Sequence, residues 1–431
     1  MQHRAQDGAA VGWNGNLASA PSPTCLSTSS PAEHVAIGYC LTRILPGDVL
    51  QPVRAGGGWF CLDGRIVADG TLVGGEESAA RLQDKLNQNQ FPCIHRETDG
   101  AYSLCFCTNR SLLVTRDAFG LKPMFSGVRD GLVAVATDRK ALWAIGIREA
   151  RTFPPGGYLE ARRDGALLEA APPVLGPAQA SPRGKVGPEE LCRSLVESVL
   201  IQTVGVDKLA VGFSGGVDST VLAKITKDTG TNVLLVTVGL GQTSEMRKAE
   251  STAREIGLPI VVRSFSKSDA EQCLDRMLWL IEEPSLMKIS IAMAMHWTAQ
   301  TAIDNGRSVI LLGQGSDELF GGYRRFATIL GESGERAAEE AISGSIRDAH
   351  LVNYQRDDQA VSSLRAELRL PFATRKMIDI AMRVPLEMKV RSSSDNIRKW
   401  ILREAAIRLG VPSAIAMRPK KAIQHASGVE K

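Results

Sequence analysis

The chain has 431 residues, of which 44% are hydrophobic and 23% are charged, enough for two or three domains with buried cores. A formal charge of +4 is close to neutral for this length, and no dense run of lysine and arginine indicates a nucleic-acid partner. Because there is no signal peptide and no apolar stretch of about 18 residues, we expect a soluble, cytoplasmic protein without a membrane partner.

The eight cysteines form no CxxC pair and no Cys/His spacing typical of a metal site. Cys105 and Cys107 alternate within an apolar segment, so they should face the same side of a strand. We interpret the cysteines as small buried residues with free thiols, which fits a reducing compartment.

Residues 1–171 consist of short apolar segments separated by turns, such as GGGWFCLDGRIVADG and GAYSLCFCTNRSLLVTRD. The pattern predicts antiparallel strands with one helix near residues 77–88. Residues 172–188, PPVLGPAQASPRGKVGP, have the composition of a linker, so a second domain is expected over residues 189–431.

Strands and helices alternate after this linker. The predicted strands are residues 208–214, 231–239, 259–265 and 307–313. Continuous β-branched runs that alternate with helices indicate a mainly parallel sheet covered on both faces. Beyond residue 331 the pattern is mostly helical.

The first predicted strand of this domain runs into SGGVDST, residues 214–220, at the start of a helix. Small residues let backbone N–H groups approach a phosphate, and the helix presents its positive end to it. Asp218 suits Mg²⁺, which prefers oxygen ligands and bridges phosphates. The absence of a following GK[ST] excludes a Walker loop, whereas a plain glycine-rich turn remains the alternative.

The fourth strand leads into LLGQGSDELFGGY, residues 311–323, where the apolar run stops at Gly313 and two acids, Asp317 and Glu318, follow within five residues. Two carboxylates from the ends of adjacent strands can hold a cation that neither would hold well alone. We expect Glu318 to support the loop.

SGGVDST after a strand resembles the PP-loop of ATP pyrophosphatases, which cleave ATP between the α and β phosphates and adenylate a substrate. Further motifs follow in order: SE at 244–245, GQGSDELFGGY, RDDQAVSSLRAELRLPF at 356–372 and MRPKKAIQHASGV at 417–429. Together they resemble the synthetase domain of asparagine synthetases over residues 188–431.

The resemblance implies a role for each matching residue. Asp218 and Asp317 would hold Mg²⁺, and Lys420 would neutralise the departing pyrophosphate, although a lysine in a basic tail can also be a plain surface residue. The other implied ATP-binding residues are Ser214, Gly215, Gly216, Ser219, Thr220, Val238, Gly313, Gln314 and Gly315, with backbone at 209–213. Glu367 and Arg369 are expected to form a structural ion pair.

The first domain resembles the class II glutamine amidotransferase domain that asparagine synthetases carry, an antiparallel β-sandwich of the Ntn-hydrolase type. HRAQDG at 3–8 and TRDAFGLKPMF at 115–125 support this match. The nucleophilic N-terminal cysteine of that family is missing, and its NGE motif is Asp63–Gly64–Arg65 here. We therefore expect no glutamine hydrolysis, either because the domain is degenerate or because a misplaced start codon omits the first strand.

The resemblance implies an ATP- and Mg²⁺-dependent ligase that adenylates a carboxylate, most plausibly aspartate, and forms an amide with ammonia or glutamine-derived ammonia. Gln314, where bacterial relatives have glutamate, and Gln359, where they have a basic residue, leave the acceptor open. Alternatives are a regulatory ATP-binding homologue, or a PP-loop ligase for another carboxylate or for RNA. A separate glutaminase and a homodimer are further expectations.

Overall fold

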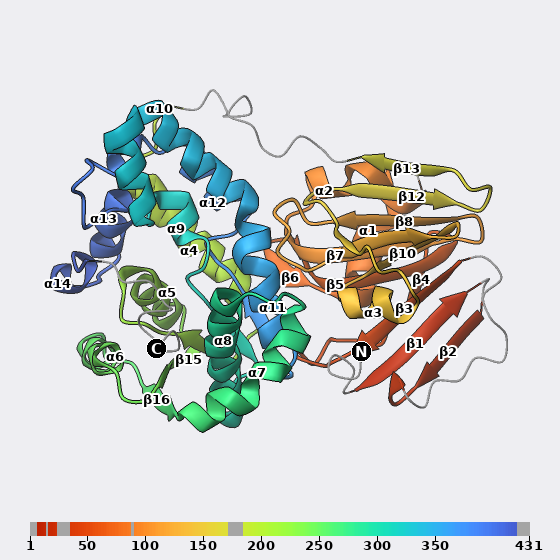
Figure 1. Ribbon diagram of the computed structural model, residues 1–431, viewed down its shortest axis with the longest axis horizontal. Coiled ribbons are helices and arrows are strands. Elements are labelled where there is room, and N and C mark those ends of the chain that lie inside the picture. Colours follow the sequence, from red (N-terminus) through yellow and green to blue (C-terminus); the bar gives the residue numbers. More distant parts are fainter. Residues whose placement is uncertain (1–6, 14–15, 24–34, 88–89, 171–183, 420–431) are drawn as a thin grey trace. The chain divides into compact units, whose positions relative to one another are not determined.

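The computed structural model describes residues 7–13, 16–23, 35–87, 90–170 and 184–419. Contacts within the chain divide it into two compact units, Met1–Val174 and Leu175–Lys431 (Figure 1). Most of the predicted linker lies outside the described residues, and its last residue, Pro188, already begins a helix.

The first unit consists of antiparallel sheets, as predicted. The largest has the order β13-β12-β8-β7-β5-β4, with β6 also paired to β5. Two smaller sheets have the orders β2-β1-β3 and β10-β9-β11. The strands are β1 (Gly8–Trp13), β2 (Asn16–Ala20), β3 (Ala36–Leu41), β4 (Val53–Ala55), β5 (Gly58–Ala68), β6 (Thr71–Val73), β7 (Gly100–Cys107), β8 (Ser111–Arg116), β9 (Phe125–Arg129), β10 (Leu132–Ala136), β11 (Arg151–Thr152), β12 (Tyr158–Arg162) and β13 (Leu167–Ala170).

Alternation along β5 and β7 gives the large sheet two buried faces. Phe60 and Leu104 belong to a core shared with helix α1 (Gly75–Asn87), which confirms the predicted helix. Trp59 and Cys107 face the other way and pack with Ile37 of β3, so the first small sheet stacks on the large one. The predicted β-sandwich is therefore present. The unit also contains a short 3₁₀ turn and two short helices, η3 (Phe91–Cys93), α2 (Ile94–Glu97) and α3 (Arg139–Ala144).

The prediction of free thiols is confirmed for the cysteine side chains that the structure describes, but only Cys61 and Cys107 are fully buried, and the other four are partly exposed. Cys105 and Cys107 contribute to the same cluster of apolar side chains, on one face of β7. Six cysteines are free thiols: Cys40, Cys61, Cys105, Cys107, Cys192 and Cys273.

The second unit contains the predicted parallel sheet, in the order β16-β15-β14-β17-β18. Four strands match the predicted ones and the fifth lies in the ELRLPF motif: β14 (Lys208–Gly212), β15 (Asn232–Leu240), β16 (Ile260–Phe265), β17 (Val309–Leu311) and β18 (Glu367–Arg369). The central strand β14 is buried from Leu209 to Val211, as its continuous apolar run requires.

Helices pack against the strands from both sides, with α5 and α6 in one group and α7, α8 and α11 in another (Figure 1). The helical elements are α4 (Pro188–Thr203), α5 (Val217–Asp228), α6 (Ser244–Glu255), α7 (Lys267–Ile281), α8 (Leu286–Asp304), α9 (Ser316–Phe320), α10 (Arg324–Ala349), the π-turn η5 (His350–Tyr354), α11 (Gln355–Ser362), α12 (Arg375–Arg383), the 3₁₀ turn η6 (Leu386–Met388), α13 (Trp400–Arg408) and α14 (Ser413–Ala416).

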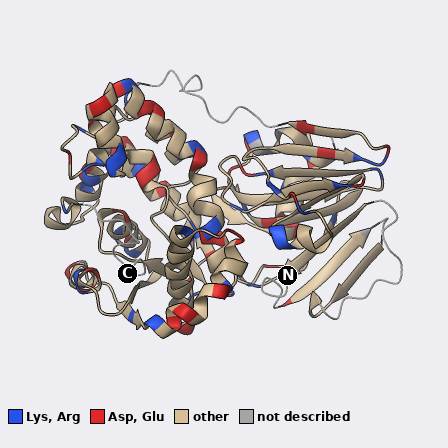
Figure 2. Ribbon diagram, viewed as in Figure 1, with Lys and Arg blue, Asp and Glu red and all other residues tan. Residues whose placement is uncertain are grey.

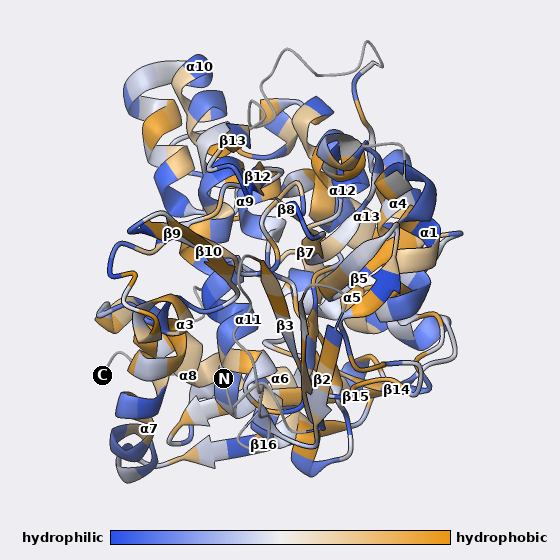
Figure 3. Cartoon of the chain, turned by 90° about the vertical axis from the view of Figure 1, so that its right-hand side faces the viewer, coloured by the Kyte–Doolittle hydropathy of each residue, from blue (hydrophilic) through white to orange (hydrophobic). Residues whose placement is uncertain are grey.

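Surface and core follow the sequence pattern. Apolar residues dominate strands such as β10 and β14 (Figure 3), whereas acidic and basic residues are interspersed on the helices (Figure 2). In the described part of the chain, no helix has the length and apolar character needed to cross a membrane.

Candidate active site

The first loop of the site connects β14 to α5. Gly215 has φ +68, and a Cβ there would lie 3.1 Å from the Cα of Ala249, so the turn favours glycine. The hydroxyls of Ser214 and Ser219 are 3.2 Å apart, and the Ser214 backbone N–H donates to the Ser219 hydroxyl over 3.2 Å. These bonds hold the loop in a compact turn at the carboxyl end of the strand.

The first turn of α5 has backbone N–H groups without a capping side chain. Its N-cap residue is Gly216, which has no side chain with which to accept a hydrogen bond from the first turn. Such first-turn N–H groups, together with the helix dipole, favour an anion. Thr220, which was predicted to bind the nucleotide, is fully buried, and its hydroxyl has no hydrogen-bond partner within the described residues.

The second loop connects β17, the neighbour of β14, to α9, and it contacts the first loop directly. A Cβ on Gly313 would lie 3.0 Å from the Cβ of Asp218. Gly315 has φ +92 and is the N-cap of α9. The two acidic motifs therefore meet at adjacent strand ends, as predicted.

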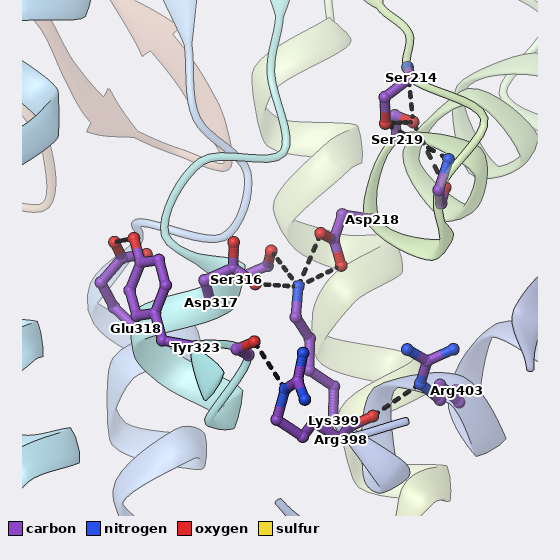
Figure 4. A network of polar contacts seen from close by, with 12 residues as sticks. Ser214, Asp218, Ser219, Ser316, Asp317, Glu318, Tyr323, Arg398, Lys399 and Arg403 are labelled. Atoms are coloured by element: carbon purple, nitrogen blue, oxygen red, sulfur yellow. Dashed lines mark hydrogen bonds and ion pairs between the residues drawn. The ribbon is translucent and has the colours of Figure 1, made fainter. Parts of the chain in front are cut away.

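Lys399 joins the two motifs (Figure 4). Its Nζ donates to both oxygens of Asp218 at 2.7 and 2.6 Å, lies 2.5 Å from Oδ1 of Asp317, and contacts the Ser316 hydroxyl at 3.1 Å. Its side chain is only 1% exposed, whereas those of Asp218 and Asp317 are 22% and 19% exposed. Burial lowers the pKa of Lys399, and the neighbouring Asp218 opposes that shift.

Lys399 was not predicted, because nothing near it in sequence indicates a carboxylate partner. It is the N-cap of α13, where a positive charge opposes the helix dipole, and that unfavourable placement is the one available signal. Arg398 and Lys399 have φ values of 53 and 55, a left-handed conformation that is strained for residues other than glycine. Asp395 stabilises this turn by accepting hydrogen bonds from the N–H groups of Ile397 and Arg398, both 2.9 Å.

The donor set at this position fits Mg²⁺ in part. Asp218 and Asp317 already contact one cation, the Lys399 ammonium, and both side chains remain partly exposed, so each has oxygen lone pairs on its open side. The described residues contain no group of three or more His, Cys, Asp or Glu that could hold a metal ion. A Mg²⁺ ion here would therefore need further oxygen ligands from a nucleotide or from water.

Gln314 donates from Nε2 to Oδ2 of Asp357 over 2.7 Å. Asp357 is fully buried, and its other oxygen accepts from Arg356 Nε over 2.8 Å. Burial raises the pKa of Asp357, and the Arg356 charge opposes that shift. Arg356 and Asp357 lie just after the π-turn η5, and turns of this type are frequent at functional sites.

Other predicted residues occupy supporting positions. Glu318 is buried and accepts from the Tyr323 hydroxyl and from Asn353 Nδ2, so its predicted role in supporting the loop is confirmed. Arg369 Nε lies 2.7 Å from Glu367 Oε1, which confirms the structural ion pair.

The positions of three further residues bear on the nucleotide prediction. Gln359 is buried, and its Nε2 lies 3.4 Å from Glu282 Oε2. Val238 is partly buried in β15, the strand beside β14. Lys420 lies outside the described residues, so its role stays a prediction.

The corresponding site of the first unit contains an ion pair. Arg65, at the position of the family glutamate, is 9% exposed and its Nη2 lies 2.9 Å from Oδ1 of Asp48. Gly64 has φ +107, and a Cβ there would clash with the Ala101 carbonyl.

The model of the asparagine synthase family matches residues 190–347 and 332–430, more than half of the chain. The chain belongs to the asparagine synthetase family. The protein named "Putative asparagine synthetase (glutamine-hydrolyzing) 1" of Methanocaldococcus jannaschii is 30% identical over 383 residues, covering 78% of this chain and 70% of that protein. Asparagine synthetase B (glutamine-hydrolyzing) of Escherichia coli K12 is 26% identical over 344 residues, 76% of this chain and 60% of that enzyme.

Among solved structures, the glutamine phosphoribosylpyrophosphate amidotransferase from B. subtilis superposes with a TM-score of 0.32 at 15% identity, over 61% of this chain and 76% of that chain. That score supports no conclusion about function. This member of the asparagine synthetase family spans 60 to 70% of the length of the two relatives described.

Proposed function

We propose that the second unit is an ATP-dependent carbon–nitrogen ligase that adenylates a carboxylate, aspartate first among the candidates, and forms an amide from the adenylate and ammonia. Membership of the asparagine synthetase family supports the reaction class. One observation supports the site. The Lys399 ammonium contacts the carboxylates of both Asp218 and Asp317, beside the backbone N–H groups at the start of α5.

Neutral, acidic and basic residues of the site would have different roles. The phosphate loop would bind the β and γ phosphates through backbone N–H groups and the hydroxyls of Ser214 and Ser219. Asp218 and Asp317 would hold Mg²⁺, which would neutralise phosphate charge when bound. Lys399 holds these two carboxylates close together without a nucleotide, so this part of the site would be preorganised.

The reaction proceeds in two displacements. A carboxylate oxygen of the acceptor attacks the α phosphorus, and the bond from that phosphorus to the bridging oxygen breaks, which releases pyrophosphate. Ammonia then attacks the acyl carbon, loses a proton, and displaces AMP together with the oxygen that the carboxylate supplied. Positioning and charge neutralisation provide most of the rate enhancement in such steps.

Gln314 limits what the site can do with the incoming amine. Because its Nε2 donates to Asp357, its carbonyl oxygen is left to accept a hydrogen bond. An amide oxygen orients an N–H group but does not take its proton at neutral pH, so that proton would pass to water or to phosphate. Because relatives with glutamate at this position have a group that can take that proton, we test acceptors other than aspartate for this chain.

We further propose that ammonia, and not glutamine bound to the first unit, supplies the nitrogen. Arg65 and Asp48 form a buried ion pair where the family glutamate would recognise glutamine. Comparing ammonium with glutamine as nitrogen source tests this point, and equal turnover with glutamine would contradict it.

The experiment for the proposed function is a pyrophosphate-release assay on the full chain with ATP and Mg²⁺. Aspartate and a panel of other carboxylates are each offered with ammonium. We expect release that depends on an acceptor and disappears in Asp218→Ala. Release by Asp218→Ala at the wild-type rate would refute the metal assignment, and no release with any acceptor would favour a non-catalytic ATP-binding homologue.

A further inference from the structure

The segment that follows α14 is held close to the phosphate loop by Arg403. This side chain is 1% exposed and donates from Nη1 to the carbonyl of Arg418 over 2.7 Å. Its Nε donates to the carbonyl of Arg398 over 2.6 Å. The backbone at Arg418 is thus tied to the turn that carries Lys399.

The side chain of Arg418 reaches helix α6. Its Nη1 donates to the Thr252 hydroxyl over 2.7 Å, while that hydroxyl donates to the Lys248 carbonyl over 2.9 Å. The Thr252 oxygen also lies 3.2 Å from the position of a Cβ on Gly215. These contacts place Nη1 of Arg418 within about 6 Å of the point that a Cβ on Gly215 would occupy, beside the loop between β14 and α5.

Three neighbouring basic side chains, Arg398, Lys399 and Arg403, already form hydrogen bonds or ion pairs with carbonyl or carboxylate oxygens. Arg403 donates from Nε, Nη1 and Nη2 to backbone carbonyls, Arg398 donates to the carbonyls of Gly322 and Asp395, and Lys399 contacts carboxylates. Within the described residues, the Arg418 guanidinium hydrogen-bonds only to a neutral hydroxyl. Its side chain is half-buried, and a guanidinium has five N–H donors in a fork that matches phosphate oxygens.

We infer that Arg418 binds the β and γ phosphates of the nucleotide and thereby the pyrophosphate that leaves, with Thr252 as a positioning residue. The inference rests on the proposed function, since it names a further ligand of the same nucleotide site. A planar cation at this position orients the leaving group and neutralises charge as the bond to the α phosphorus breaks.

Calorimetric binding of three probes, pyrophosphate, ATP and AMP, each with Mg²⁺, tests this role without requiring turnover. Arg418→Ala should weaken pyrophosphate and ATP binding roughly 10- to 100-fold, because a charge-assisted hydrogen bond is lost, and should change AMP binding less than about twofold. Thr252→Val should cause a smaller loss of the same selectivity. Arg336→Ala is the matched control, since that side chain is 92% exposed on α10 and should leave all three affinities unchanged.

Unchanged pyrophosphate affinity in Arg418→Ala, or an equal loss for AMP and ATP, would overturn the inference and leave the proposed function standing. A wild-type chain that binds neither ATP nor pyrophosphate would overturn both. If Arg418→Ala does not fold, Arg418→Lys is measured in its place. Lysine keeps the positive charge but lacks the forked N–H donors of the guanidinium. This variant should lose pyrophosphate and ATP affinity relative to AMP affinity, but by a smaller factor than Arg418→Ala.

Discussion

Lys399 is the residue on which the site depends most. Its ammonium lies between two carboxylates that belong to different loops, and without it these like charges would face each other at close range. Removing one partner from a buried ion pair leaves uncompensated charge, which is far more costly than losing a pair in water.

Lys399→Met should therefore lower the free energy of unfolding of the second unit by about 3 kcal/mol. The matched control is Lys376→Met, because Lys376 pairs with Glu197 where both side chains are about half exposed, and its loss should cost less than about 1 kcal/mol. Urea unfolding of both variants provides the comparison. Equal effects of the two substitutions would contradict the assigned role of Lys399.

His296 provides a pH-dependent prediction away from the site. It is 6% exposed, its Nδ1 lies 3.2 Å from the Ala360 carbonyl, and burial lowers its pKa from 6.5 to about 4. The unfolded imidazole takes up a proton below about pH 6.5, whereas the folded one does so only near pH 4, so stability is lost as pH falls through this window.

Between pH 7 and about pH 4.5, this single group should cost the wild-type chain about 2.5 kcal/mol of stability. His296→Gln does not titrate, so its stability should fall by about that much less over the same interval. Urea unfolding of both chains at the two pH values measures the difference. A parallel decrease in both chains would show that the imidazole is not buried in its neutral form.

At the scale of elements, the site depends on glycines that allow two loops and a helix start to approach closely. Gly322 follows α9, and a Cβ there would clash with Asp317 Oδ1 and with Lys399 Cε. Gly344 lies within α10, where the nearest atom to an added Cβ is Arg347 Nη2 at 3.6 Å.

Gly322→Ala should reduce pyrophosphate release by roughly 100-fold, because small displacements of positioned groups cost about that much. Gly344→Ala should leave release unchanged and stabilise α10 by up to about 1 kcal/mol. Rates from the pyrophosphate assay, with circular dichroism as a check on folding, separate the two. Full activity in Gly322→Ala would mean that the contact between Lys399 and Asp317 is dispensable.

The elements themselves were largely predictable. Strand β14 is a continuous apolar run, and the small residues of 214–220 predicted the turn into α5, so the strand, the turn and the start of the helix could be located from the sequence. The partner of Asp218 was not predictable, because Lys399 lies 181 residues away and no local pattern connects them. Arg418 and Asp357 were not singled out for the same reason, because tertiary contacts and not periodicity bring them to Thr252 and Gln314.

At the scale of the whole molecule, every described residue of the proposed nucleotide site belongs to the second unit, from Ser214 to Arg418. The first unit retains the sandwich, and within β5 the residue Arg65 of the Asp63–Gly64–Arg65 segment forms an ion pair with Asp48. We therefore expect the complete ligase reaction to depend on the second unit and on free ammonia.

The most direct test of this account follows the oxygen of the acceptor. Aspartate labelled with ¹⁸O in its side-chain carboxylate is incubated with the full chain, ATP, Mg²⁺ and ammonium, and the products are analysed by mass spectrometry. The account predicts unlabelled pyrophosphate and AMP that carries one ¹⁸O atom, since the carboxylate oxygen leaves with AMP. ADP together with labelled inorganic phosphate would contradict it, because the attack would then have occurred at the γ phosphorus.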